Sequence, residues 1–145
     1  REIEASCQHL QETYPDRVRA VLTFDAQLSR RMYGGGDMIL MPSRYEPCGL
    51  AQMIAMRYGC IPIARATGGL KDTIQDANQP GATGFLFKES GSKDLAETII
   101  RAFRYFSDTT IWREMQQRGM QMDFSWQRSA LAYAQVYLSL VEDRQ

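Results

Sequence analysis

The chain has 145 residues, of which 44% are hydrophobic and 23% charged, and its 17 basic residues balance its 17 acidic ones. This is the composition of an ordinary water-soluble domain, and a net charge of zero gives no electrostatic reason to expect nucleic acid or an anionic membrane as a partner. No stretch approaches the roughly 18 apolar residues that a membrane-spanning helix needs.

The elements expected in chain order alternate between helix and strand. Helices are predicted over residues 3–13, 26–33, 50–58 and 67–77, strands over 18–24, 37–41, 60–64 and 84–87, and three closing helices over 93–106, 109–120 and 126–142. Ser92, Asp108 and Ser125 are expected to cap the closing helices. Pro62 suggests an edge or irregular position for its strand. The pattern predicts one α/β domain with a Rossmann-like parallel sheet, an α/β portion over 1–91 and C-terminal helices over 92–145.

The start of the sequence and its cysteines suggest that the chain is part of a longer, cytoplasmic protein. The sequence starts at Arg1 inside an expected helix and shows no signal peptide, so we expect a piece of a longer protein. The cysteines, Cys7, Cys48 and Cys60, lack close paired spacing, which indicates reduced thiols in the cytoplasm. A single histidine, His9, is a poor basis for a metal site, and no metal is expected.

Two glycine turns follow predicted strands, where open parallel sheets bind their ligands. In "EPCGLAQM" (46–53) the first-turn amides of Gly49, Leu50 and Ala51 lack helical partners and could hold a phosphate, and "ATGGLKDT" (66–73) offers a similar set. Many helices also begin with glycine for steric reasons alone, and the pattern leaves that alternative open.

Glu46 stands beside this expected anion site. A carboxylate there suits sugar hydroxyls better than phosphate, because it accepts charge-assisted hydrogen bonds from them. The alternative is an acidic residue that favours the helix dipole, worth about 0.3–1 kcal/mol. Glu46 therefore favours a nucleotide-sugar site over a plain nucleotide site.

A long run of residues matches a known family. "PSRYEPCGLAQMIAMRYGCIPIARATGGLKDT", preceded by "LSRRMYGGGDMILMPS" and followed later by "MDFSWQRSALAYAQVYLSL", closely resembles bacterial glycogen synthases and plant starch synthases. The resemblance covers almost the whole chain. It implies the later part of the C-terminal, donor-binding domain of a two-domain GT-B glycosyltransferase, which transfers glucose with retention from ADP-glucose to the non-reducing end of an α-1,4-glucan.

The resemblance also implies partners and site residues. No cofactor is expected besides the donor, whose base (ADP or UDP) stays open; the glucan would bind through a missing N-terminal domain, and the location would be the cytoplasm, or the plastid in a plant. Glu46 would hold a glucose hydroxyl and stabilise the oxocarbenium-like transition state, and Cys48 would line the same pocket. The donor-binding residues would be Phe24 at the base, Gly49, Leu50 and Ala51 at the diphosphate, Thr67, Gly68 and Gly69 beside the sugar and phosphate, and also Pro47.

Two departures and a rival hypothesis remain. Ile54 stands where many other retaining GT-B enzymes have a ribose-binding glutamate, and the family's basic residues for the diphosphate are not in this chain. Arg44, Arg57 and Arg65 could approach the phosphates or serve structural ion pairs. The rival is a non-catalytic α/β module that binds a nucleotide or a protein, although the chain has no G-x-G-x-x-G motif.

Overall fold

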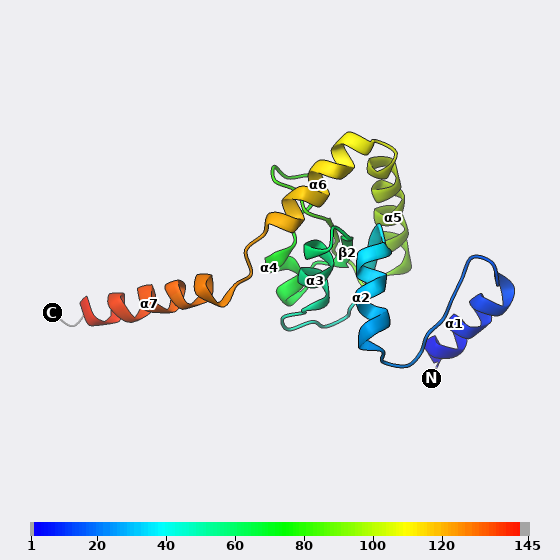
Figure 1. The fold of residues 1–145 in the computed structure, drawn as a ribbon, viewed down its shortest axis with the longest axis horizontal. Coiled ribbons are helices and arrows are strands. Elements are labelled where there is room, and N and C mark those ends of the chain that lie inside the picture. The colour runs from blue at the N-terminus through cyan, green and yellow to red at the C-terminus, as the bar shows by residue number, and fades with distance from the viewer. Residues whose placement is uncertain (1, 143–145) are drawn as a thin grey trace. The chain divides into compact units, whose positions relative to one another are not determined.

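The computed structural model describes residues 2–142 and divides the chain into two compact units, Arg1–Arg31 and Met32–Gln145. The first unit contains helix α1 (Glu2–Thr13) and a following irregular segment (Figure 1). Helix α2 (Ala26–Gly35) begins in the first unit and ends in the second.

The strand predicted over 18–24 is wrong, because these residues form no strand in the structure. A strand requires a neighbour for its backbone groups, and no strand is found within the described part of the first unit. Instead the Ala20 N–H donates to the Gln11 side chain in α1 at 2.8 Å. Val21 and Leu22 remain 55% and 45% exposed, so the apolar side chains that suggested a strand have no core to enter here.

The second unit is built on a three-stranded parallel sheet with the order β1-β2-β3. Strands β1 (Met38–Met41), β2 (Ile61–Arg65) and β3 (Phe85–Phe87) are joined through α3 (Ala51–Arg57) and α4 (Gly68–Thr73). Each connection places a helix between two parallel strands, as expected of βαβ units. The predicted α/β class and parallel Rossmann-like sheet are confirmed.

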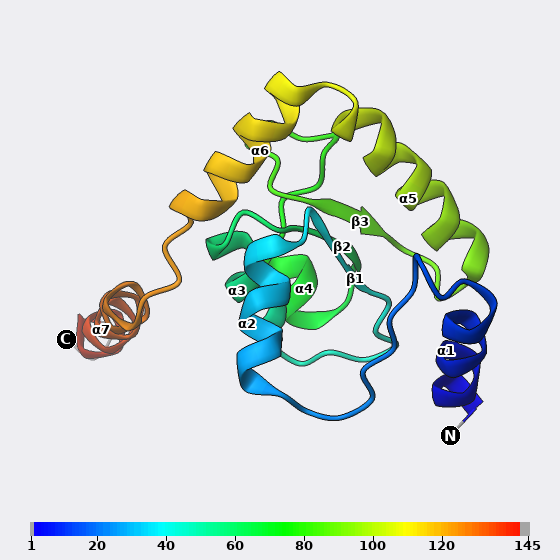
Figure 2. The same ribbon diagram turned by 45° about the vertical axis from the view of Figure 1, so that its right-hand side comes forward.

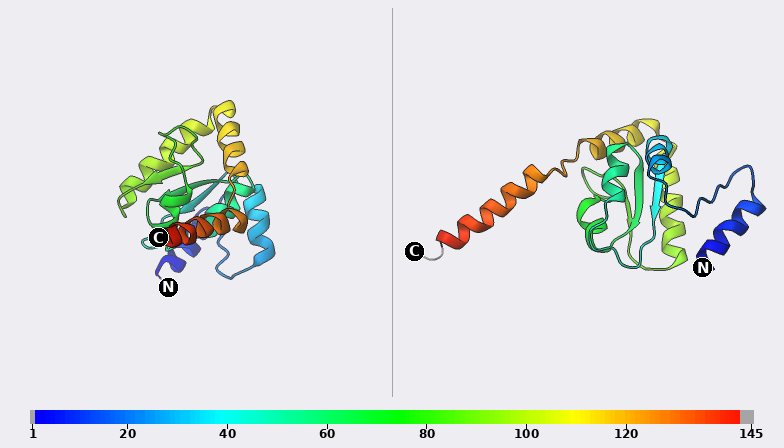
Figure 3. Two further views of the ribbon diagram at one scale, coloured as in Figure 1. Left: turned by 90° about the vertical axis from the view of Figure 1, so that its left-hand side faces the viewer. Right: turned by 60° about the horizontal axis from the view of Figure 1, so that its bottom comes forward.

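Helices cover both faces of the sheet (Figures 2 and 3). Helices α5 (Ser92–Phe106) and α6 (Thr109–Gln121) cover one face, over a buried cluster that includes Ile61, Ile63, Phe85, Trp112 and Met115. Helices α3 and α4 cover the other face, over a cluster that includes Met41, Met56, Ala64, Leu70 and Ile74. Ile61 and Ile63 of β2 belong to the first cluster and Ala64 to the second, so the strand has apolar side chains on both faces.

Pro62 lies in the central strand, and the edge position suggested by the sequence is wrong. The strand tolerates it because of where the pairing with β3 begins. The Ala66 N–H bonds to Phe87 O at 2.7 Å, so even-numbered residues here direct their N–H toward β3. Strand β3 starts only at Phe85, opposite Ile63, and the missing N–H of Pro62 falls just before that ladder.

The closing helices are α5, α6 and α7 (Trp126–Glu142), at nearly the predicted bounds. Asp108 caps α6 as predicted, since its Oδ1 accepts from the N–H groups of Thr110 and Ile111 at 3.0 and 3.1 Å. The expected Ser92 cap is wrong: Gly91 occupies the cap position of α5, without a side-chain hydrogen bond. None of the helices within residues 2–142 combines the length and apolar character that a membrane span requires.

Candidate functional site

The loop after β1 and the turn after β2 lie against each other at the carboxyl ends of neighbouring strands. We call residues 46–49 the EPCG loop and residues 67–69 the TGG turn. The Gly69 N–H donates to Pro47 O at 3.1 Å, which joins the two segments through their backbones. The structure therefore brings together the two glycine segments that the sequence singled out.

Glycine is required at this junction because backbone meets backbone. A Cβ atom on Gly68 would lie 1.9 Å from Glu46 O, and one on Gly69 would lie 1.9 Å from Cys48 O. Gly68 and Gly49 also have φ angles of +45° and +71°, which side chains other than glycine rarely adopt. The steric explanation for these glycines is thus correct in part, and it applies to contact between the two segments.

The two predicted catalytic side chains, Glu46 and Cys48, both belong to the EPCG loop. Glu46 is half-buried, and its Oε2 lies 3.5 Å from Ser43 Oγ, at the outer limit of a hydrogen bond. Cys48 is exposed, as are Pro47 and Leu50. Carboxylate and thiol are therefore both accessible to a ligand.

The backbone amides of the two segments differ in availability. In the TGG turn and α4, Gly69 N–H is bonded to Pro47 O and Leu70 N–H donates to Thr67 O at 3.2 Å. In the described residues no hydrogen bond is donated by the N–H of Gly49 or of Leu50. The N–H groups of Ala51 and Gly68 also have no partner in the described residues, so most of the free donors for an anion lie in and directly after the EPCG loop, and one lies in the TGG turn.

Gln52 is a residue of this junction that the sequence analysis did not select. Its side chain is fully buried, and Nε2 lies within 2.9–3.1 Å of Gly49 O, Cys48 O and Thr73 Oγ1. The only signal for it in the sequence was a glutamine three residues after Gly49, in the first turn of a predicted helix, and a polar side chain there is typical of a solvent-facing position.

Two of the three arginines that could have approached phosphates, Arg57 and Arg65, donate to backbone carbonyls instead. Arg65 donates from Nε to Ser43 O at 2.8 Å and also bonds to Arg44 O, which anchors the segment before Glu46. Arg57 donates to Met120 O at 2.9 Å. Their partners are backbone carbonyls and not the carboxylates of an ion pair. No group of three or more His, Cys, Asp or Glu residues within 2–142 could hold a metal ion.

Phe24 lies in the first unit, where its side chain is 92% exposed. The EPCG loop belongs to the second unit. Cys60 is buried, whereas Cys48 is exposed. Burial, with a smaller contribution from Asp37, raises the pKa of the Cys60 thiol to about 11.

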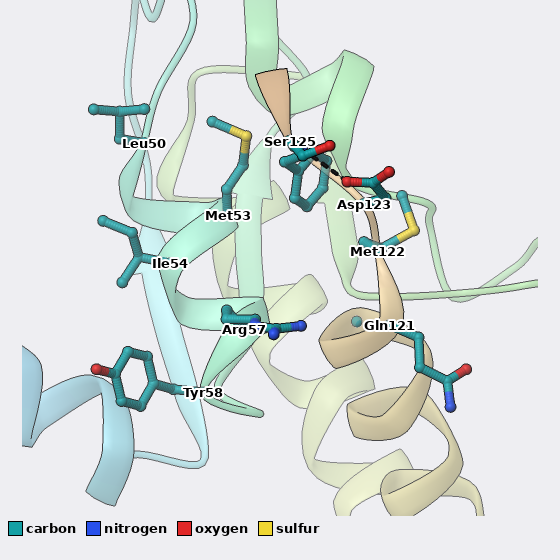
Figure 4. A pocket seen from close by; sticks show the side chains of 11 residues that line it. Leu50, Met53, Ile54, Arg57, Tyr58, Gln121, Met122, Asp123 and Ser125 are labelled. Atoms are coloured by element: carbon teal, nitrogen blue, oxygen red, sulfur yellow. Dashed lines mark hydrogen bonds between the residues drawn. The ribbon is translucent and has the colours of Figure 1, made fainter. Parts of the chain in front are cut away.

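A cavity of about 580 Å³ borders the junction on the α3 side (Figure 4). It lies between α3 and the segment that follows α6, and its lining is mostly apolar: Leu50, Met53, Ile54, Arg57, Tyr58, Gly119, Gln121, Met122, Asp123, Phe124 and Ser125. The Ser125 N–H donates to Asp123 Oδ1 at 2.8 Å across its rim. Leu50 is the only predicted site residue in this lining, so the cavity and the two glycine segments are neighbours rather than one pocket.

Comparison with known proteins decides the family. Residues 3–110 match the model of the glycosyl transferases group 1 family. The chain belongs to this family. Among curated members of similar sequence, it is 47% identical over 142 residues to the glycogen synthase of Anoxybacillus flavithermus and 47% identical over 132 residues to that of Gloeobacter violaceus. These two matches include 97% and 90% of this chain, respectively. The chain spans only 29% of the length of each relative.

Solved glycosyltransferase structures agree with the fold. The catalytic domain of starch synthase IV from Arabidopsis thaliana, bound to ADP and acarbose, superposes with a TM-score of 0.84 at 36% identity, over 97% of this chain and 30% of that one. A sucrose-phosphate synthase from Thermosynechococcus elongatus gives a TM-score of 0.64 at 30% identity, over 96% of this chain and 34% of that one. The resemblance to glycogen and starch synthases is confirmed.

Proposed function

We propose that this chain is the donor-binding part of a glycogen or starch synthase, which transfers glucose from ADP-glucose to the non-reducing end of an α-1,4-glucan with retention. The observation that carries the proposal is the junction of the two glycine segments, which presents Glu46, Cys48 and two unpaired amides at the carboxyl edge of the sheet. The similarity to glycogen synthases, and to a starch synthase whose structure contains ADP, supports it.

The site residues divide according to the charges that appear during transfer. When the bond between glucose and the diphosphate breaks, positive charge develops on the sugar ring and negative charge on the leaving group. In our proposal the Glu46 carboxylate holds a glucose hydroxyl and stabilises the ring charge, while Cys48 lines the sugar pocket. The N–H groups of Gly49, Leu50 and Ala51, next to Pro47, bind the diphosphate. Because these donors are already in place, they stabilise the negative charge of the leaving group in the transition state without a rearrangement of the protein.

The remaining assignments complete the donor site. Thr67, Gly68 and Gly69 border the sugar and phosphate, and Phe24 stacks on the base. We assign residues 1–91 to the α/β portion and 92–145 to the C-terminal helices of the donor-binding domain. The glucan binds to an N-terminal domain outside this chain, no cofactor takes part, and the enzyme works in the cytoplasm, or in the plastid of a plant.

A titration of the full-length protein tests this proposal. Calorimetry with ADP, UDP and their glucose adducts measures which donor binds, and transfer of labelled glucose to glycogen measures turnover. We expect ADP and ADP-glucose to bind more tightly than the uridine compounds, and label to enter the polymer. Binding of ADP without transfer would favour the non-catalytic nucleotide-binding module, and no binding of either nucleotide would refute the proposal.

A further inference from the structure

We propose that Gln52 and Thr73 are positioning residues that aim the amides of the EPCG loop at the donor diphosphate. The inference rests on the proposed function and names residues that set the geometry of its site. It starts from the hydrogen bonds of the Gln52 side chain. Nε2 lies 3.1 Å from Cys48 O, 2.9 Å from Gly49 O and 3.1 Å from Thr73 Oγ1.

Two carbonyls of the loop are thereby turned inward. Both peptide bonds that follow these carbonyls are trans, since the described residues contain no cis peptide bond. In a trans peptide the C=O and the next N–H point in opposite directions. When the carbonyls of Cys48 and Gly49 face Gln52, the N–H groups of Gly49 and Leu50 must therefore face away from it. Neither of these two amides has a partner in the described residues.

Thr73 extends this contact to the other segment. Its hydroxyl accepts from Gln52 and itself donates to Gly69 O at 2.5 Å. Because the Gly69 N–H donates to Pro47 O, the EPCG loop and the TGG turn are joined by a backbone bond and by the Gln52–Thr73 relay. The relay therefore fixes both the direction of the loop amides and the spacing of the two segments.

The Gln52 amide is poorly explained by stability alone. Its Oε1 is buried and has no hydrogen-bond partner in the described part of the chain. An unsatisfied buried carbonyl is unfavourable by about 1–3 kcal/mol, which offsets much of what the Nε2 contacts contribute. Oε1 also lies 2.5 Å from where a Cβ of Gly49 would stand, so the side chain fits only against a glycine.

Substitutions in the full-length protein test the inference through ADP binding, which does not depend on turnover. Gln52→Met keeps the volume of the side chain and removes its amide, and should raise the Kd for ADP at least about tenfold, because it frees both carbonyls. Thr73→Val should raise that Kd about threefold, and Thr73→Ser, which keeps the hydroxyl, should restore it. The KM for ADP-glucose should follow the Kd.

A matched control separates positioning from folding. Thr83 is buried, and its Oγ1 accepts from the Gln75 N–H at 3.0 Å outside both glycine segments. Thr83→Val should lower the Tm and leave the Kd for ADP unchanged. Gln52→Met and Thr73→Val proteins that bind ADP as the wild type does would overturn the inference, whatever their Tm, and Thr73→Val alone decides if Gln52→Met does not fold. A wild-type protein without affinity for ADP would instead refute the proposed function, and the inference with it.

Discussion

Glu46 is a residue whose charge can be removed without disturbing the core. Its side chain is half-buried in the loop after β1, and its one hydrogen bond, to Ser43, is long. In the full-length protein Glu46→Gln should lower kcat by about 10²–10⁴-fold, because the charge that stabilises the transition state is lost. The Tm should change little. Steady-state assays with ADP-glucose and glycogen, with a melting curve, measure both, and a variant with more than a tenth of wild-type activity would remove Glu46 from the site.

The cysteines should differ in reactivity. Cys48 is exposed, whereas Cys60 is buried with a pKa raised to about 11, so that about one Cys60 in a thousand is a thiolate at pH 8. Brief treatment with iodoacetamide at pH 8 should alkylate Cys48 and spare Cys60 in the folded protein, as peptide mass spectrometry can measure. In urea both should react, which is the control. Equal labelling of the two thiols in the folded state would contradict the structure.

At the level of elements, the contact between the two glycine segments should be intolerant of one added methyl group. A Cβ on Gly69 would lie 1.9 Å from Cys48 O, so Gly69→Ala must displace the backbone of one segment and should lower the free energy of unfolding by about 2–4 kcal/mol. Gly35→Ala is the matched control: nothing lies within 4 Å of its Cβ, and alanine favours the helix there by up to about 1 kcal/mol. Urea unfolding of both variants measures the difference, and equal stabilities would show that the segments yield.

The pairing of Asp76 with Arg101 ties α5 to β3 and should make stability depend on pH. Burial would raise the pKa of Asp76, but hydrogen bonds from Arg101 and from the N–H groups of Leu86 and Asn78 hold it below its ordinary value. A lowered carboxyl pKa stabilises the fold above the unfolded value near pH 4, and this contribution is lost as the pH falls through the folded value.

Asp76→Asn should therefore destabilise the protein by about 2–3 kcal/mol at pH 7. The difference from the wild type should begin to shrink as the pH falls below the unfolded value near 4, and it should be lost only below the lowered folded pKa, where the carboxyl of the folded wild type is protonated as well. Urea unfolding curves between pH 7 and pH 2.5 measure this. A difference that stays constant over the whole range would show that the ionisation of Asp76 does not contribute.

The three strands of the sheet could be predicted from the sequence. The two predictions that depend on neighbouring strands, a strand over 18–24 and an edge position for Pro62, were wrong. Strands 37–41, 60–64 and 84–87 were recognisable because buried parallel strands are apolar on both faces. The segment 18–24 is also rich in β-branched and apolar residues, but such residues form a strand only where another strand lies beside them. Pro62 misled for a related reason, because the position at which β3 begins pairing is a tertiary property.

The candidate site was predictable in its backbone and not in its supports. Glycines at fixed places after strands located the two segments, since positive φ angles and close approach require that residue. That the segments touch, and that Gly69 uses its amide for this contact, depends on the register between β1 and β2. Gln52 escaped notice because only the folded chain shows that its amide is buried.

For the whole molecule, we expect the 145-residue chain alone to transfer no glucose and to bind ADP weakly. The chain spans about 29% of the length of its glycogen synthase relatives, so in our proposal it lacks the domain that holds the glucan. Positioning of the acceptor accounts for about 7–11 kcal/mol of barrier lowering. The EPCG loop is also open to water, which weakens its contacts with the diphosphate. Calorimetry with ADP and an assay with ADP-glucose and glycogen measure both, and extension of glycogen by this chain would place the catalytic machinery elsewhere.

The backbone contact between the EPCG loop and the TGG turn also limits how related enzymes can be recombined. The two segments are separated in sequence by α3 and β2, yet the backbone of the EPCG loop leaves no room for a side chain at Gly68 or Gly69 of the TGG turn. A chimera that takes residues up to β2 from one parent and the rest from another combines the EPCG loop of one protein with the TGG turn of the other. The two backbones then need not fit each other. Crossovers placed before residue 42 or after residue 73 keep the pair, with Gln52 and Thr73, as one inherited block.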